Sequence, residues 1–266
     1  MIGIGIGIDK QHLPASTQHA LVTAWAAATG VTDPTLLGAL NTLVTGMDGA
    51  GILNLYDCIY VLLGGSASAN KYNLINAVDS DAAYRLTFAG GLTHQSSGVL
   101  PDGTTGYANT HWTPSVDASG TAGGMGYYSR TNESKASIDI GSYGGGGEND
   151  IYIVYPAYGS FYMWNNSGSA TAVTNADSRG WYRSNRTATN QQGWKNGVKV
   201  IDEAKASGAS TYSTYLFCGN AAGTANYFSG KECALAVVTP NSFTAGQLEA
   251  EYTLINAFMT TLGINV

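Results

Sequence analysis

Residues 81–110, DAAYRLTFAGGLTHQSSGVLPDGTTGYANT, lie where the sequence changes from helical to β character. In Tyr84–Phe88, polar and apolar side chains alternate with a period of two, which predicts a half-buried strand. Within 101–106, proline presets φ and an Asp-Gly pair supplies the residue that accepts positive φ, so this segment is expected to turn. Helical periodicity precedes residue 81 and returns only near residue 244. This stretch therefore separates a small helical region from a long β region.

The composition of the 266 residues favours a β-rich protein that is extracellular or lies on the surface of a particle. Charged residues make up 11% of the chain, against about 25% in a typical soluble domain. Glycine occurs 35 times and tyrosine 17 times, and the net charge is −6. Binding to a phosphate backbone requires clustered Lys and Arg, which this sequence lacks. Nucleic acid is therefore excluded as a partner.

Several segments resemble a group of bacteriophage virion proteins. The stretch 81–94 and the motif GVLPDGTTGYA (98–108) are similar to virion proteins that carry a concanavalin A-like, or LamG-like, jelly-roll domain. Gly180–Val200 resembles the same family, as does KECALAVV (231–238) followed by a helix that ends in TTLG. The resemblance implies an antiparallel two-sheet jelly-roll sandwich. It also implies that the first and last strands pair, which would place Tyr84–Phe88 beside 231–238.

The expected organisation has three parts: an extended arm over 1–14, a short helical anchoring region over 15–65, and a jelly-roll domain with a C-terminal helix over 66–266. In the arm, glycine alternates with isoleucine, so the isoleucines fall on one face of an extended chain. Two interpretations remain open. Either the arm is a frayed terminus or minor edge strand, or it docks as an added strand on a neighbouring subunit. The residues concerned are Ile2, Ile4, Ile6 and Ile8.

Capping residues and glycines mark where the expected helices begin and end. A first helix is expected from a cap at Ser16 or Thr17 to Gly30, and a second from Asp33-Pro34 to Gly46. A third, apolar over much of its circumference, is expected over 48–64 and would join the β domain. The C-terminal helix has a capping box at Thr244 and Gln247, and Gly263 ends it.

Between residues 81 and 240, short apolar or alternating runs are separated by Gly, Asn and Ser, which is typical of an antiparallel sandwich. The clearest hairpin is at Asn196-Gly197, a pair that favours the type I′ turn. The expected strands are Tyr84–Phe88, Gly106–Thr110, Gly126–Ser129, Ser137–Ile140, Asp150–Tyr155, Ser160–Trp164, Gly180–Arg183, Gln192–Lys195, Val198–Ile201, Ser213–Gly219 and Lys231–Val238.

The three cysteines, Cys58, Cys218 and Cys233, lie in apolar runs and are expected to be buried and reduced. The N-terminus has no basic segment followed by a continuous apolar segment, so no signal peptide is expected. No apolar run reaches about 18 residues, so no membrane span is expected. These features fit a protein that assembles in a host cytoplasm and is carried in the virion.

Catalytic patterns are incomplete, and no enzyme activity is expected. Glucanases of the concanavalin A-like fold carry E-x-D-x-E on one strand face, whereas this chain has tyrosine in the third position of Glu148-Asn149-Asp150-Ile151-Tyr152. The histidines His12, His19, His94 and His111 have unrelated contexts, and no nucleophile elbow is present.

No metal-ligand spacing is recognisable either. Some LamG-like domains hold Ca²⁺ through loop carboxylates, and this resemblance makes Asp102, Asp117 and Asp177 the candidate contributors. No other cofactor is expected.

Glycan binding is the most plausible ligand function, because aromatic rings stack on the apolar faces of sugars while Asn, Asp and Arg bind hydroxyls. The competing interpretation is that these aromatics fill the sandwich core. The candidate residues are Tyr143, Tyr158, Trp164, Trp181 and Arg183, of which Tyr143 and Tyr158 adjoin glycine-rich loops or a glycine.

The sequence thus predicts a structural component of a phage particle: a head fibre, a capsid decoration or a tail-associated protein. It would be anchored through its N-terminal region to other virion proteins and would display a lectin-like sandwich. Self-association, for example as a trimer, is expected because such appendages are commonly symmetric. The alternative is an adhesin that binds a host-surface glycan, and a more remote alternative is a glycoside hydrolase.

Overall fold

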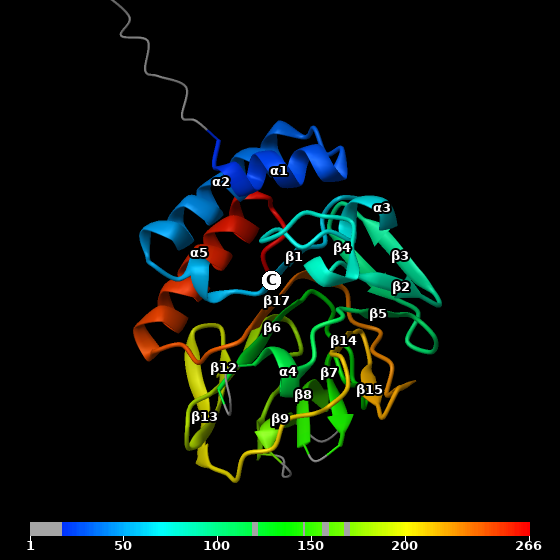
Figure 1. Cartoon of the computed structure of the whole chain (residues 1–266), viewed down its shortest axis with the longest axis vertical. Coiled ribbons are helices and arrows are strands. Elements are labelled where there is room, and N and C mark those ends of the chain that lie inside the picture. Colours follow the sequence, from blue (N-terminus) through cyan, green and yellow to red (C-terminus); the bar gives the residue numbers. More distant parts are fainter. Residues whose placement is uncertain (1–17, 119–121, 146, 156–159, 168–170) are drawn as a thin grey trace, which may run out of the picture.

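The computed structural model describes residues 18–118, 122–145, 147–155, 160–167 and 171–266, with only the backbone described for Glu148, 150–155 and 160–167. The chain forms a layer of helices, a sheet packed against it (sheet A) and a second sheet (sheet B), and Figure 1 shows the long helices at the top. The fold is mainly β, a two-sheet sandwich, which confirms the expected fold class.

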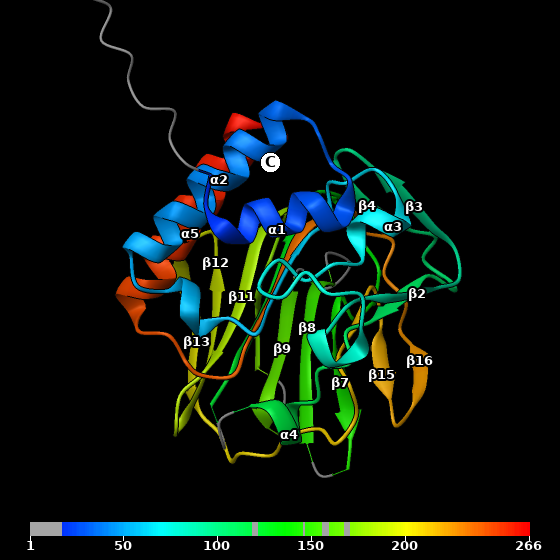
Figure 2. The ribbon, with the colours of Figure 1, turned by 45° about the horizontal axis from the view of Figure 1, so that its top comes forward.

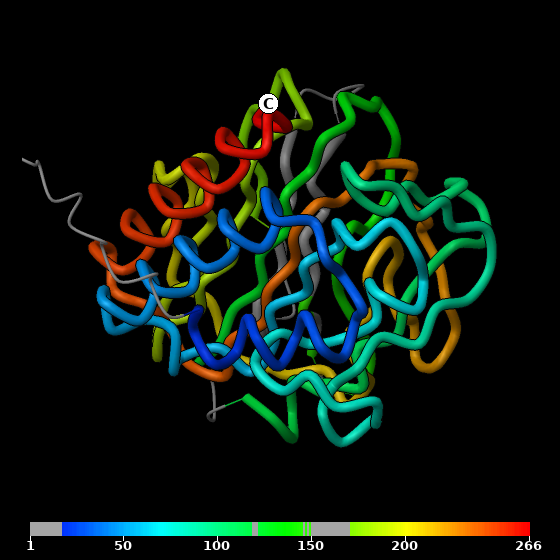
Figure 3. Tube along the Cα trace, turned by 90° about the horizontal axis from the view of Figure 1, so that it is seen from above, coloured from blue at the N-terminus to red at the C-terminus, as the bar shows by residue number. Residues whose placement is uncertain are grey.

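Three helices form the outer layer: α1 (Ala20–Thr29), α2 (Pro34–Gly49) and α5 (Ala245–Thr261). Asp33 caps α2 with Pro34 in its first turn, and the capping box of α5 is present, so both predicted signals are confirmed. His19 caps α1, whereas the predicted caps lie outside the described residues. Seen from above, α2 and α5 run side by side (Figure 3). The shorter helical segments are η1 (Leu53–Leu55), α3 (Ala67–Asn70), η2 (Asp81–Ala83) and α4 (Pro114–Asp117).

Sheet A lies under the helices. Its strand order is β13 (Val198–Ala204), β12 (Asn190–Lys195), β11 (Gly180–Arg186), β6 (Gly124–Ser129), β17 (Cys233–Thr239), β4 (Gly98–Pro101) and β3 (Leu92–Gln95), with β1 (Cys58–Val61) also paired to β17.

Sheet B forms the other side of the sandwich, with β7, β8 and β9 side by side in Figure 2. Its strand order is β10 (Thr171–Thr174), β9 (Ser160–Ser167), β8 (Gly147–Tyr155), β7 (Ile140–Gly144), β14 (Tyr215–Leu216), β5 (Tyr107–Asn109) and β2 (Thr87–Ala89), with β15 (Gly219–Ala221) beside β7 and β16 (Thr224–Asn226) beside β15.

Two hydrophobic cores follow from this layering, one on each face of sheet A. In β17, Leu235 and Val237 pack against the helices, whereas Ala236 and Val238 pack between the two sheets. Successive side chains of a strand point to opposite faces, so a strand covered on both sides is apolar throughout. This explains why the run 231–238 lacks clean alternation.

The predicted third helix over 48–64 is wrong: α2 continues to Gly49, Leu53–Leu55 form only the short η1, and the second half forms β1. Ile59 and Val61 pack against the helices, while Cys58 and Tyr60 pack between the sheets. A short apolar run that is buried on both faces cannot be distinguished from a buried helix by its periodicity. The expected helical region 15–65 therefore ends in a strand of sheet A.

The predicted strand Tyr84–Phe88 begins three residues later than expected. Residues 81–83 form η2, and Tyr84 adopts φ 57°, so the alternating pattern there does not reflect a sheet. The strand β2 pairs with β5 in sheet B. The prediction that this segment lies beside 231–238 is wrong, because β17 pairs with β1, β4 and β6.

Two other strand predictions differ from the structure. The strand predicted over Ser137–Ile140 lies over Ile140–Gly144, because Ser137 and Asp139 hydrogen-bond to side chains of another segment. The strand predicted over Ser213–Gly219 is split into β14 and β15 by Phe217, whose φ is 69°. By contrast, the Asn196-Gly197 hairpin is confirmed, with φ values of 49° and 74°.

Glycine at position 126 is required by the packing of sheet A. A Cβ there would lie 2.4 Å from the Cη2 atom of Trp181 and 2.8 Å from the Cγ2 atom of Val237. We expect Gly126→Ala to lower the free energy of unfolding by about 1–3 kcal/mol through overpacking. Gly38→Ala is the matched control, because nothing lies within 4 Å of a Cβ at that position of α2. The control should raise the free energy by about 0.5–1 kcal/mol, and equal effects in urea unfolding would contradict this packing.

Candidate functional site

Three tyrosines from three strands share one face of sheet B. Tyr215 of β14 lies opposite Asn109 of β5 and opposite Gly141 of β7. Tyr107 is two residues from Asn109, and Tyr143 is two residues from Gly141. Because strand side chains alternate, all three tyrosines project to the same face. We call Tyr107, Tyr215 and Tyr143 the tyrosine row.

The tyrosine row faces away from the sandwich core. Ala108, Leu216 and Ile140, which occupy the alternate positions of the same strands, are buried between the two sheets. The row must therefore lie on the outer face of sheet B. Each of its side chains remains partly exposed.

Contacts between rings fix the geometry of the row. The rings of Tyr107 and Tyr215 are stacked, with centroids 4.9 Å apart and planes inclined by 20°. Phe228 lies beside them, its ring centroid 6.5 Å from that of Tyr107. The absence of a side chain at Gly219 leaves room for the Tyr143 ring, whose Cε1 atom would lie 3.2 Å from a Cβ there. Partial burial, with Tyr107 nearby, raises the pKa of Tyr215, so its hydroxyl remains a hydrogen-bond donor at neutral pH.

Polar side chains flank one end of the row. The Asn109 Oδ1 atom accepts a hydrogen bond from the His111 N–H at 2.8 Å, and the His111 Nε2 atom lies 2.8 Å from the Thr87 hydroxyl. Burial lowers the pKa of His111, against the opposing effect of Asp81, so the imidazole is neutral at pH 7. An amide, a hydroxyl and a neutral imidazole supply both donors and acceptors at this position.

Helices α1, α2, α4 and α5 do not cover the tyrosine row. Helices α1, α2 and α5 pack in the core on the far side of sheet A (Figures 1 and 2). Helix α4 lies at the end of the sandwich, where the Ser115 N–H donates to the Ser210 carbonyl at 3.0 Å. Aromatic side chains on an open sheet face provide a platform for a ligand.

Trp181 and Arg183 are buried, each with 1% of its surface exposed. The Arg183 Nε atom donates to both carboxylate oxygens of Glu251 in α5, at 3.2 Å each, and the Trp181 Nε1 atom donates to Glu251 Oε2 at 3.3 Å. Both residues thus hold α5 on sheet A. This burial corrects the prediction, since neither side chain reaches a surface where a glycan would bind.

Of the other predicted residues, Tyr143 belongs to the tyrosine row. Trp164 lies in β9, but its side chain is outside the described residues. The remaining predicted residues, Tyr158 and Ile2, Ile4, Ile6 and Ile8 of the arm, also lie outside them.

Sequence reasoning missed Tyr107 and Tyr215, although both lie in or near expected strands. Each strand is two or three residues long, which is too short to show which face is exposed. The two tyrosines are separated by more than 100 residues and meet only through strand pairing. The one available signal was the Tyr-Ala-Asn pattern at Tyr107, with polar Asn109 on the same side as the tyrosine.

The three candidate calcium carboxylates are occupied by local contacts. Asp102 accepts hydrogen bonds from the N–H groups of Thr104, Thr105 and Gly106, and these bonds, with that of the Thr105 hydroxyl, hold its pKa well below the usual range. The other two bind elsewhere: Asp117 to the Tyr84 hydroxyl and Asp177 to Arg179. Within the described part of the chain, no three His, Cys, Asp or Glu residues gather as metal ligands do.

Of the residues considered for catalysis, His12 lies outside the described residues. His19 caps α1, and His94 packs edge-on against Phe88 with ring centroids 4.7 Å apart. Residues 148–152 lie in β8, where the side chains of Glu148, Asp150 and Tyr152 are outside the described set. The absence of enzyme activity stays a prediction.

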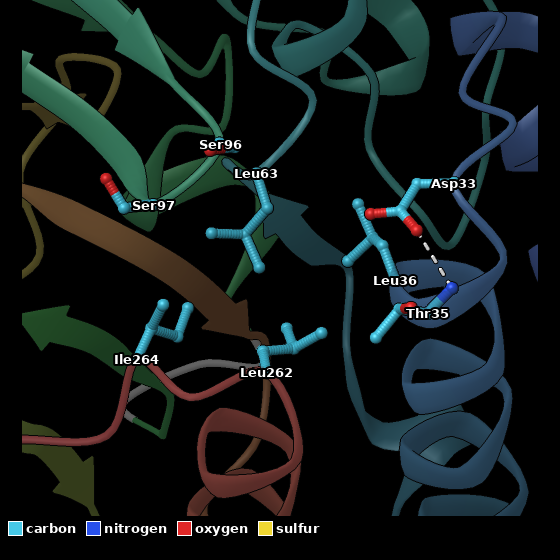
Figure 4. Close-up of a pocket in the computed structure, with 8 residues that line it drawn as sticks. All are labelled: Asp33, Thr35, Leu36, Leu63, Ser96, Ser97, Leu262 and Ile264. Atoms are coloured by element: carbon cyan, nitrogen blue, oxygen red, sulfur yellow. Dashed lines mark hydrogen bonds between the residues drawn. The ribbon is translucent and has the colours of Figure 1, made fainter.

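A small groove lies near the start of α2 (Figure 4). Its two overlapping lobes, of about 210 and 260 Å³, share Leu36, Leu63, Ser96 and Asp33. The Asp33 carboxylate already accepts the Thr35 N–H at 2.9 Å. Sites for small ligands are usually lined by hydrophobic and aromatic side chains with a few convergent polar groups. The residues around this groove include no aromatic side chain, so it is a weaker candidate for sugar binding than the tyrosine row.

No family model matches the sequence, and no curated protein matches it. Solved structures are similar to parts of the chain. The binding domain of botulinum neurotoxin serotype D matches with a TM-score of 0.50 at 9% identity, over 77% of this chain and 52% of the other. Trypanosoma rangeli sialidase in complex with sialic acid gives a TM-score of 0.47 at 9% identity, over 66% and 31%. The CBM40 of Ruminococcus gnavus IT-sialidase, bound to α2,3-sialyllactose, gives 0.40 at 16% identity, over 51% and 84%.

The chain spans about half or less of the first two solved structures that it matches. At this identity the likeness extends to the β-sandwich fold alone. In the described part of the chain, no helix combines the length and apolar character needed to cross a bilayer.

Proposed function

We propose that this chain is a carbohydrate-binding, lectin-like module whose contact surface is the tyrosine row. The observation that carries this proposal is the alignment of Tyr107, Tyr215 and Tyr143 on the outer face of sheet B. Three strands from distant parts of the sequence place partly exposed rings side by side on a surface that helices α1, α2, α4 and α5 do not cover.

The chemistry of the row suits a sugar. Pyranose rings have apolar C–H faces that pack on aromatic rings, and tyrosine adds a hydroxyl at the edge of that contact. Tyrosine also loses little conformational entropy on binding, since only two χ angles become fixed. Asn109, Thr87 and His111 lie at the end of the row, where they can donate to and accept from sugar hydroxyls.

We propose binding without turnover. The described acidic side chains that are fully buried, Glu251 and Asp139, are paired with cations, and Asp102 is bound to its own turn. A retaining glycosidase needs two carboxyl groups about 5–5.5 Å apart beside the sugar. The polar groups identified beside the tyrosine row are instead an amide, a hydroxyl and an imidazole, with one carboxylate, that of Asp81, 3.4 Å from the His111 Nε2 atom.

The virion role remains a proposal that the layout of the molecule favours. The described chain begins beside α2, where the His19 N–H donates to Asn41 Oδ1 at 2.6 Å, on the helical side of the molecule (Figure 1). Attachment through the N-terminal region would therefore leave sheet B facing outward.

If residues 1–14 anchor the chain, their deletion should leave a folded sandwich that no longer incorporates into particles, and normal incorporation would contradict anchoring.

A glycan array probed with the whole chain tests the binding proposal. We expect binding to a restricted set of oligosaccharides, and loss of that binding in a Tyr107→Ala/Tyr215→Ala double variant. Tyr72→Ala is the matched control, because Tyr72 lies outside sheet B and packs against the helical core. No bound glycan, or equal binding by the double variant, would contradict the proposal.

A further inference from the structure

Two oppositely charged side chains meet in the interior, between the two sheets. Lys231 precedes β17 of sheet A, and Asp139 precedes β7 of sheet B. Both side chains are 0% exposed, and the Lys231 Nζ atom lies 3.3 Å from Asp139 Oδ1. An ammonium and a carboxylate are thus enclosed together at the join of the two layers.

A second carboxylate and two hydroxyls complete the group, which we call the Lys231 cluster. The Lys231 Nζ atom donates to the Ser137 hydroxyl at 2.7 Å and lies 3.9 Å from Glu133 Oε2. On the other side, the Ser229 hydroxyl donates to Asp139 Oδ1 at 2.5 Å. The lysine nitrogen is therefore held between two carboxylates.

The position of Glu133 depends on a glycine. The Gly230 N–H donates to Glu133 Oε2 at 3.1 Å, and a Cβ at Gly230 would lie only 2.6 Å from Glu133 Oε1. Unlike its two partners, the Glu133 side chain is 31% exposed. Glu133 thus connects the buried pair with water.

The surroundings of the pair are largely apolar and aromatic. The Tyr127 hydroxyl donates to the Lys231 carbonyl at 2.8 Å, and the Phe217 N–H donates to the Asp139 carbonyl at 2.8 Å. The Tyr127 and Phe217 rings pack edge to face in the core between the sheets. Taking two opposite charges out of water costs free energy, and proton transfer from ammonium to carboxylate removes both charges.

We propose that Lys231 and Asp139 form an intramolecular isopeptide bond, with Glu133 as the catalytic acid–base. Proton transfer within the pair gives an amine and a carboxylic acid. The amine nitrogen forms a bond to Cγ of Asp139, and the bond from Cγ to one carboxyl oxygen breaks. Glu133 accepts a proton from the attacking nitrogen and returns it to the departing oxygen, so one water molecule is released. The reaction consumes no oxidant, reductant or activated donor.

The geometry favours this step. Reacting atoms about 3–3.5 Å apart in a fixed orientation approach the transition state without further loss of translational entropy, and Nζ lies 3.3 Å from an oxygen one bond away from Cγ. A positioned acid–base typically contributes about 10²–10⁴-fold. Departure of the water toward the exposed side of Glu133 would make the reaction irreversible in practice.

The bond would join the two sheets covalently. It would close a loop of roughly 90 residues, and cross-links across loops of that length constrain the unfolded chain strongly. The three cysteines of the chain are buried and form no disulfide. The isopeptide would supply a covalent cross-link of the kind that disulfides provide in other proteins.

The test is the intact mass of the full chain, measured after denaturation. We expect a mass lower than the sequence mass by one water molecule, and a branched peptide after proteolysis that links Lys231 to Asp139. A mass equal to that of the sequence would overturn the proposal. Because loss of water at an Asp-Gly pair gives the same mass, the branched peptide must be found as well, and its absence would be equally decisive.

Variants test which residues take part in forming the isopeptide bond. Lys231→Met and Glu133→Gln should each restore the full sequence mass, whereas Lys199→Met, at an exposed ion pair with Asp202, should leave the loss of water unchanged. Asp139→Asn should still react and release ammonia instead of water, so its product would have the same mass as the wild-type product. Failure of Glu133→Gln to prevent the bond would overturn the role of Glu133.

The thermal midpoint gives an independent readout. Glu133→Gln retains the lysine and the aspartate, so it removes the bond and leaves the buried pair in place. We expect its midpoint to fall by about 10 °C. If Glu133→Gln kept the wild-type midpoint and still lacked one water molecule relative to its own sequence mass, the proposal would be contradicted.

Discussion

Replacing Glu251 by glutamine is expected to lower the free energy of unfolding by about 3–5 kcal/mol, because it leaves the charge of Arg183 buried without a counter-charge. The side chains of Arg183 and Glu251 are 1% and 0% exposed. Glu251 also accepts the Tyr56 hydroxyl at 2.7 Å, and burial raises the pKa of that tyrosine, so its proton stays in place to donate. Chemical denaturation monitored by tryptophan fluorescence measures the loss.

The matched control is Asp177→Asn. Asp177 pairs with Arg179 on the surface, where the two side chains are 42% and 45% exposed. Pairs of this kind contribute only about 0.2–1 kcal/mol because water and salt screen them. If Glu251→Gln and Asp177→Asn had equal effects, the buried pair would not be what holds α5 on sheet A.

A double variant distinguishes the loss of the whole ion pair from the cost of leaving one buried charge without a partner. Replacing Arg183 and Glu251 together by apolar residues, as in Arg183→Met/Glu251→Leu, removes both charges and leaves no unpaired ion. Such replacements are often neutral or stabilising when the shape is kept. We therefore expect the double variant to be more stable than Glu251→Gln, and the reverse order would contradict the assignment of the cost to an uncompensated charge.

Removing the central ring of the tyrosine row is expected to weaken glycan binding by about 2 kcal/mol, or roughly 30-fold in Kd. Tyr215 stacks on Tyr107 and lies between the two outer members of the row. Tyr215→Ala should therefore have a larger effect on affinity than Tyr143→Ala. Calorimetric titration with the best glycan from the array measures both.

Two further variants serve as controls for this measurement. Tyr215→Phe keeps the ring and removes the hydroxyl, so it should retain most of the affinity if stacking dominates. Trp181→Ala should unfold or destabilise the chain, because its indole is buried and bonded to Glu251. Full affinity in Tyr215→Ala would show that the row is not the contact surface.

Local signals were predicted well from the sequence. The Asn196-Gly197 turn, the Asp33-Pro34 start of α2 and the capping box at Thr244 each depend on residues within a few positions of one another. Their conformations follow from steric limits on φ and from the hydrogen bonds that a helix end leaves open. Those limits are the same wherever the segment lies in the fold.

Features that depend on distant partners were not predicted. The segment that forms β1 was expected to be a helix, because its apolar residues show no period that reveals pairing with β17, some 175 residues away. Trp181 and Arg183 were glycan-binding candidates, with burial in the core as the competing interpretation for the aromatic residues, because the sequence of β11 does not tell which of its faces α5 covers. The tyrosine row has the same origin, since β5 and β14 meet only in the folded sheet.

The central claim, that the outer face of sheet B binds a sugar, is tested most directly by an NMR titration that follows the tyrosine ring signals of the whole chain. We predict that the signals of Tyr107, Tyr143 and Tyr215 shift together as the glycan is added. The signals of the buried Tyr56, Tyr60 and Tyr127 should stay in place. Binding that leaves the tyrosine row unshifted and moves signals elsewhere would contradict the account.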